Sequence, residues 1–149
     1  KKFDKLDFKK IHPAGSLGAQ LKTVEDIMVT GEKIPFVDEN LMINDALKTL
    51  SNKKLGILII QDKNKKTKGI VTDGQIRRVN LKKINFNLLP VKKIMTTKPM
   101  SIEKDELAAK ALSIMNEKKI TSLAVHNKRD KFKTIGIIHI HHILQSKIT

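Results

Sequence analysis

Three polar residues that directly follow the apolar run 69–71 have the side chains best suited to bind a ligand. The hydroxyl of Thr72 can donate to a phosphate, the carboxylate of Asp73 can accept from sugar hydroxyls, and Gln75 adds an amide. The run before them reads as a short buried strand that breaks into a helix, which is where α/β proteins commonly hold phosphorylated ligands. These residues predict a site for a phosphorylated or sugar-containing molecule. The alternative is that Thr72 and Asp73 only cap the helix that follows.

The same arrangement recurs 67 residues later, where histidines follow the run 136–138. By this offset His139 replaces Thr72 and His142 replaces Gln75, so His139 is expected to hydrogen-bond a ligand or a backbone carbonyl. If the strand continues to His141, His139 and His141 share one face and His142 points away. Since no carboxylate lies in the motif, we predict no metal site here.

One lysine stands before the first strand of each copy. Lys33 stands beside Ile34-Pro35, and Lys98 stands beside Pro99. Both are candidate phosphate contacts, and the alternative for each is a solvated surface side chain.

Composition limits the class of partner. The net charge is +15, yet the chain has only three arginines, no Tyr and no Trp, and its lysines are spread along the whole sequence. This pattern argues against nucleic acid and leaves a general attraction for phosphorylated small molecules. The chain has no cysteine, no apolar run near 20 residues and no secretory signal. We therefore expect a cytoplasmic protein without a membrane partner.

Most of the chain is a tandem repeat with offsets of 65 to 67 residues. Each copy predicts a strand, a helix, two strands and a second helix, an α/β (α+β) pattern whose apolar faces would pair around one continuous core. Ile43, Ala46, Leu47 and Leu50 fall on one face of the first long helix. Asn40 and Asp105 are the predicted N-caps of the two long helices.

This repeat, from Val24 to Leu144, resembles the tandem CBS (cystathionine β-synthase) domain, or Bateman module. The resemblance implies two β-α-β-β-α repeats about a pseudo-two-fold axis, with CBS domain 1 at 22–84 and CBS domain 2 at 85–149. Such modules bind nucleotides or related metabolites in clefts between the copies and control an attached enzyme or transporter. The family usually carries an Asp three residues after the Thr. Gln75 and His142 occupy these positions, which argues against ribose recognition of the usual kind.

The first twenty residues sharpen the resemblance. The loop 12–18, His-Pro-Ala-Gly-Ser-Leu-Gly, is similar to the junction between the sugar isomerase (SIS) domain and the CBS pair of D-arabinose-5-phosphate isomerases. Residues 1–21 would then be the C-terminal tail of an SIS domain and a linker. By resemblance, His12 lies in the active site of the full-length parent, an aldose–ketose isomerase that converts ribulose 5-phosphate to arabinose 5-phosphate for Kdo and lipopolysaccharide synthesis. These 149 residues lack the SIS domain, so we expect no isomerase activity from them.

Taken together, the sequence predicts a regulatory binding module without a cofactor of its own. It would sense a nucleotide or nucleotide-sugar, such as CMP-Kdo or an adenine nucleotide, and pass that state to the SIS domain of the same chain. Two alternatives are a structural CBS module that has lost ligand binding and supports oligomerisation, and a free-standing adenine-nucleotide sensor. Family analogy implies a homo-dimer through the CBS pairs and a homo-tetramer for the full-length protein.

Overall fold

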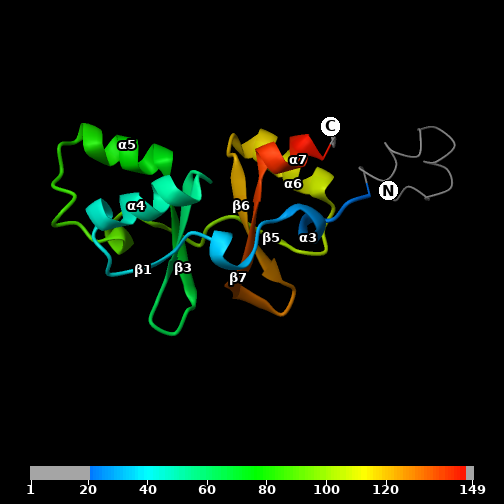
Figure 1. Cartoon of the computed structure of the whole chain (residues 1–149), viewed down its shortest axis with the longest axis horizontal. Helices are drawn as coiled ribbons and strands as arrows, with labels where there is room; N and C mark the ends of the chain where they lie inside the picture. The colour runs from blue at the N-terminus through cyan, green and yellow to red at the C-terminus, as the bar shows by residue number, and fades with distance from the viewer. Residues whose placement is uncertain (1–20, 147–149) are drawn as a thin grey trace, which may run out of the picture.

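Each repeat folds in the predicted order of strand, helix, strand, strand, helix (Figure 1). The computed structural model describes residues 21–146, so the predicted SIS tail and His12 lie outside the described residues. The first repeat comprises β1 (Phe36–Asp38), α4 (Ile43–Lys53), β2 (Ile57–Gln61), β3 (Thr67–Thr72) and α5 (Asp73–Leu81). The second comprises β5 (Ser101–Glu103), α6 (Ala108–Lys118), β6 (Ser122–Asn127), β7 (Asp130–His139) and α7 (Ile140–Gln145). The predicted α/β fold class is confirmed.

Short leading segments precede both repeats. The first contains α3 (Val24–Ile27) and the 3-10 helix η1 (Gly31–Lys33), and the second contains η2 (Val91–Lys93) and β4 (Thr96–Thr97). None of the helices within residues 21–146 combines the length and apolar character needed to cross a bilayer.

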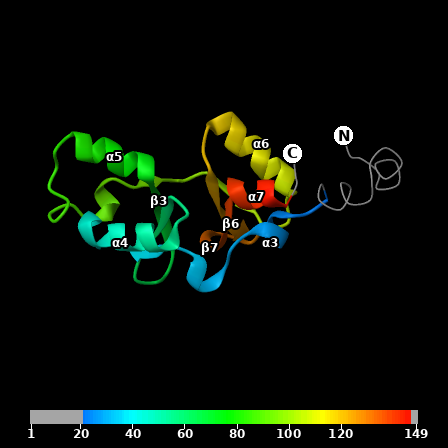
Figure 2. The same ribbon diagram turned by 45° about the horizontal axis from the view of Figure 1, so that its top comes forward.

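The strands form two sheets, one for each repeat. In the order β1-β2-β3-β4, β1 runs parallel to β2 and the remaining neighbours are antiparallel. In the order β5-β6-β7, β5 runs parallel to β6, which pairs with β7 in antiparallel fashion. The two units lie side by side, with the long helices toward one end and the β2–β3 and β6–β7 hairpins toward the other (Figures 1 and 2).

Within residues 21–146 the core consists of three clusters, where the sequence predicted one continuous core. Strand β2 explains the division, because its alternate side chains point to opposite faces of the sheet. Leu58 and Ile60 pack in the cluster under the helices of the first repeat, whereas Ile57 and Ile59 pack in a central cluster that includes Ile137 of the second repeat. All five side chains are at most 1% exposed. The central cluster therefore joins the two sheets face to face.

The two repeats exchange their leading segments. Val24 is fully buried in the core cluster of the second repeat, and its N–H donates to the carbonyl of Glu106 at 2.8 Å. Val91 is buried in the core cluster of the first repeat, and its N–H donates to the carbonyl of Leu41 at 2.8 Å. Figures 1 and 2 show α3, in blue, beside α6 and α7 of the second unit. The packed units are therefore not the same as the sequence repeats.

Two glycines permit the crossing of these leading segments. A Cβ atom on Gly69 would lie 2.5 Å from the carbonyl oxygen of Thr96, and one on Gly136 would lie 2.9 Å from the carbonyl oxygen of Val29. Both distances are shorter than any ordinary carbon–oxygen contact. The glycine that opens each β-branched run is thus the position where the other repeat's segment crosses the sheet.

The predicted N-caps of the long helices are wrong. Met42 and Leu107 are the N-cap residues, two positions after Asn40 and Asp105, and neither makes a side-chain capping bond. Distant backbone carbonyls satisfy the free N–H groups instead: Ile43 donates to Leu89 at 2.8 Å, and Ala108 donates to Lys22 at 2.9 Å. Tertiary contacts with the leading segments therefore replace local caps.

Candidate functional site

A cleft of about 840 Å³ lies between the two repeats at the helical end of the sheets. We call it the helix-end cleft. It brings together four of the predicted ligand-binding residues, and it is formed where β2 and β6 begin and where β3 and β7 end. Its lining comprises Lys54, Leu55, Gly56, Ile57, Ile70, Thr72, Asp73, Gly74, Gln75, Arg77, Arg78, Thr96, Met100, Lys118, Lys119, Ile120, Thr121, Ser122, His139 and His141.

Thr72 and Gln75 form a reciprocal capping box at the start of α5. Thr72 Oγ1 accepts from the N–H of Gln75 at 3.4 Å, and Gln75 Oε1 accepts from the N–H of Thr72 at 2.8 Å. Asp73 is the first helical residue, and its N–H donates to the carbonyl of Gly56 at 3.1 Å. Thr72 therefore caps the helix, whereas Asp73 is its first residue and is not the cap, and a role of either in ligand binding stays a prediction. A ligand that contacts Thr72 would share its hydroxyl with the helix.

Gln75 also ties the two repeats together. Its Nε2 donates to the carbonyl oxygen of Ile94 at 3.0 Å and to Thr96 Oγ1 at 3.0 Å, both in the second leading segment. Every polar atom of the side chain thus has a protein partner. We call this pair of bonds the Gln75 clamp. An aspartate at this position has no N–H to make it, which gives the departure from the family pattern a structural reason.

The cleft is strongly basic. Five cationic side chains line it, whereas Asp73 is the only carboxylate among the described residues of its lining. The cations that the sequence analysis did not select as site residues are Lys54, Arg77, Arg78, Lys118 and Lys119. A net excess of positive charge around a concave site attracts phosphorylated ligands.

The repeat offset contained a signal for two of these lysines. Lys54 and Lys119 are 65 residues apart, the offset of the long helices, and each ends its helix in the left-handed conformation, with φ of 58° and 57°. Gly and Asn are the usual residues at such positions, so a lysine in both copies is informative. Each lysine therefore lies shortly before the next strand, at the lining of the helix-end cleft.

The three histidines gather at the end of β7. The strand ends at His139 and a helix begins at Ile140, as the 67-residue offset from Thr72 predicts, so His141 does not continue the strand. His139 caps this helix, its Nδ1 accepting from the N–H of His141 at 3.1 Å, and the two rings stack with centroids 5.0 Å apart. Burial, followed by the nearby His141 and His142, lowers the pKa of His139 below its usual value of 6.5. Its imidazole is therefore neutral at pH 7 and presents a hydrogen-bonding group to the cleft.

The other predicted site residues lie elsewhere. Lys33 and His142 line two neighbouring hollows of about 480 and 520 Å³ beside the first leading segment. His142 Nδ1 is buried there without a hydrogen-bond partner among the described residues. Lys98 lines a third cleft, at the hairpin end of the sheets. The seven predicted ligand contacts thus divide among separate cavities, and Thr72, Asp73, Gln75 and His139 remain together.

Comparison with known proteins gives matches in sequence. The family model described as CBS domain matches residues 24–82 and 91–148. Arabinose 5-phosphate isomerase KdsD of Escherichia coli K12 and that of Yersinia pestis are each 35% identical over 147 residues, which is 98% of this chain and 44% of the relative. The chain therefore spans less than half the length of these curated relatives.

Solved structures match the fold. CBSX2 of Arabidopsis thaliana, solved in complex with AMP, superimposes with a TM-score of 0.73 and 25% identity, covering 85% of this chain and 96% of that chain. A protein with CBS domains from Burkholderia ambifaria MC40-6 gives a TM-score of 0.68 and 29% identity, covering 77% of this chain and 82% of that one.

Proposed function

The chain belongs to the CBS domain family, and on that premise we propose that it is a regulatory module whose helix-end cleft binds a phosphorylated nucleotide or nucleotide-sugar. The basic lining of this cleft carries the proposal, because five cations face one carboxylate in a space of about 840 Å³. A volume of this size accommodates a nucleotide. The nine-residue helix α5 also begins at the cleft, and its N-terminal end favours an anion.

The relatives support the same ligand class. CBSX2 has a structure in complex with AMP, and the relatives named KdsD are isomerases of a sugar phosphate. Adenine nucleotides and CMP-Kdo are accordingly the first effectors to test. Calorimetric titration of the chain with AMP, ATP, CMP and CMP-Kdo tests the proposal, and the absence of binding heat and of any rise in melting temperature with all four would contradict it.

A matched pair of lysines makes the titration specific to the cleft. Lys119 and Lys83 both have positive φ, 57° in each case, but only Lys119 lines the helix-end cleft. Asn tolerates this backbone conformation and removes the charge. Lys119→Asn should weaken the binding of the nucleotide about tenfold to a hundredfold, the loss of roughly one charged hydrogen bond. Lys83→Asn should leave it unchanged, and equal losses in both variants would point to bulk charge instead of the cleft.

We also propose that the module acts on an SIS domain in the same polypeptide, with residues 1–21 as the tail of that domain and His12 as an active-site residue of the complete isomerase. CBS domain 1 would extend over 22–84 and CBS domain 2 over 85–149. The greater length of the KdsD relatives supports this arrangement. The isolated chain should not convert ribulose 5-phosphate to arabinose 5-phosphate, and detectable turnover by the purified chain would overturn the assignment.

The Gln75 clamp favours a second candidate, a structural module that has lost nucleotide binding and supports oligomerisation. The clamp uses the amide at the position where the family usually presents an acceptor for ribose. Gln75→Asp restores a carboxylate there. If the cleft is a degenerate adenosine site, this variant should bind AMP more tightly than the parent does, whereas no binding of any nucleotide by either protein favours the structural module.

A further inference from the structure

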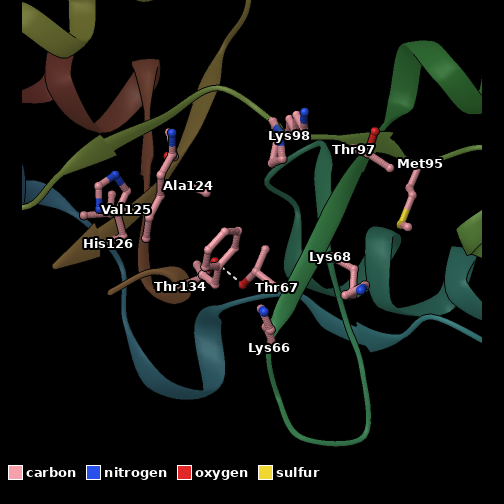
Figure 3. A pocket seen from close by; sticks show the side chains of 14 residues that line it. Lys66, Thr67, Lys68, Met95, Thr97, Lys98, Ala124, Val125, His126 and Thr134 are labelled. Carbon is pink, nitrogen blue, oxygen red and sulfur yellow. Dashed lines mark hydrogen bonds between the residues drawn. The ribbon is translucent and has the colours of Figure 1, made fainter. Parts of the chain in front are cut away.

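A second cleft, of about 500 Å³, lies at the opposite end of the two sheets from the helix-end cleft (Figure 3). We call it the hairpin cleft. It is formed between the start of β3 in the first repeat and the hairpin of β6 and β7 in the second. Thr67 and Thr134, 67 residues apart in the repeat, join the two sides through a hydrogen bond of 2.7 Å between their hydroxyls. Its size lies within the range of small-molecule sites.

The charge in this cleft is of one sign. Lys66, Lys68, Lys98 and Lys131 line it, and the described residues of its lining include no carboxylate. The acidic residues of the two hairpins are used within their own turns. Asp62 Oδ1 accepts from the N–H groups of Asn64 and Lys66 at 2.8 and 3.0 Å, and Asp130 Oδ1 accepts from the N–H of Phe132 at 3.2 Å. The carboxylate of Asp62 attracts Lys66 and Lys68 from outside the described lining, so the lining itself keeps an excess of positive charge and favours an anion.

One part of the wall of the hairpin cleft is apolar, beside the hydroxyl and imidazole side chains that also line it. Phe132 is 56% exposed at the tip of its hairpin, and Lys66 Nζ lies 4.6 Å from the centre of its ring. Met95, Pro99 and Val125 supply further apolar surface. A flat apolar group can stack on the ring of Phe132 while its charged group meets the lysines.

We propose that the hairpin cleft is a second ligand site, for a small organic anion that carries its carboxylate or sulfonate on an aromatic body. The ligand bridges the two repeats, with its anionic group toward Lys98 and its ring against Phe132, beside Lys66. The site is distinct from the helix-end cleft in both place and chemistry, since that cleft has a carboxylate for sugar hydroxyls and this one has an aromatic wall.

The fluorescent dye 8-anilinonaphthalene-1-sulfonate, an aromatic sulfonate, is the probe for this site. Lys98→Asn tests it against Lys65→Asn, because both lysines are exposed and have positive φ, 53° and 64°, but Lys65 lies outside the cleft. We expect saturable binding of the dye to the native chain. Lys98→Asn should weaken that binding about fivefold to tenfold, and Lys65→Asn should not change it. Phe132→Ala should weaken it without lowering the melting temperature, since the side chain is largely exposed.

Two competition experiments complete the test. Benzoate should displace the dye and acetate should not, because only benzoate has the apolar body. AMP in excess should leave the dye bound. Displacement of the dye by AMP would place it in the helix-end cleft and overturn the proposal, as would equal losses in Lys98→Asn and Lys65→Asn or binding that does not saturate.

Discussion

Replacing Gln75 with Asp separates the two tasks of this side chain, the helix cap and the clamp across the repeats. The cap should survive. At the start of α3, Asp26 Oδ2 accepts from the N–H of Thr23 at 2.8 Å, the same bond that Gln75 Oε1 makes to the N–H of Thr72 at 2.8 Å. An aspartate three residues after the N-cap therefore completes a capping box in this chain.

The clamp should be lost, because a carboxylate at position 75 has no N–H for Ile94 or Thr96. Two neutral hydrogen bonds of 3.0 Å disappear, each contributing about 0.5 to 1.5 kcal/mol, for a total of about 1 to 3 kcal/mol. A negative charge in the first turn of α5 returns about 0.3 to 1 kcal/mol. The free energy of unfolding should therefore fall by about 1 to 2 kcal/mol.

Urea unfolding followed by far-ultraviolet circular dichroism measures this loss. With an m value of about 2 kcal/mol/M, the midpoint of Gln75→Asp should fall by about 0.5 to 1 M. Thr96→Val provides the control, since it removes one partner of the clamp from the other side. In the double variant, the loss should be smaller than the sum of the two single losses. An unchanged midpoint in Gln75→Asp, or strictly additive losses, would refute the clamp.

Three further predictions concern the packing and the pH dependence of stability. Gly69→Ala should lower the free energy of unfolding by about 1 to 3 kcal/mol, because its Cβ would meet the carbonyl oxygen of Thr96 at 2.5 Å. Gly74→Ala, whose Cβ would lie nearest to the flexible end of Arg78, should be neutral or stabilising in the same urea assay. Equal effects of the two substitutions would contradict the crossing of the leading segment at Gly69. Because the pKa of His139 is lowered on folding, the unfolded chain binds this proton more readily, and stability should fall as the pH drops below about 6.5. His139→Asn keeps a capping side chain and should reduce that fall in urea midpoints measured from pH 7.5 to 5.5, whereas an identical pH dependence would count against it. Ile59→Ala should lower the free energy of unfolding by about 2 to 5 kcal/mol, and both repeats should still unfold in a single transition, at a lower urea concentration. Two separate transitions would show that the central cluster does not couple the repeats.

The repeat made most of the fold predictable from the sequence. Two copies of one apolar pattern reinforce each other, so the order of strands and helices and the buried face of α4, with Ile43, Ala46 and Leu50, agree with the structure. Local pattern was sufficient wherever an element's partners lie in the same repeat. The position of Thr72, Asp73 and Gln75 in one cleft could be predicted for the same reason, because all three lie at the start of one helix.

Contacts between distant segments were not predictable in this way. Asn40 and Asp105 are residue types that commonly cap helices. In the structure the carbonyl oxygens of Leu89 and Lys22 accept from the first N–H groups of the two long helices instead. Lys98 was predicted as a phosphate contact because it stands beside Pro99. In the structure the second leading segment passes between the clefts, so Thr96 faces one cleft and Lys98 lines the other. This segment is too short to show a periodic pattern, so its sequence does not predict which cleft each residue faces.

The exchange of leading segments has a consequence for how the chain acquires its structure. A first repeat that emerges alone during synthesis lacks Val91, Ile94 and Met95 from its core and β4 from the edge of its sheet. It can close that core only when the second segment has been made, and the second repeat in turn needs Val24 from the start of the chain. Such long-range closures are slow but cost little extra free energy as the loop lengthens. We therefore expect the pair, and not the single repeat, to be the unit that folds.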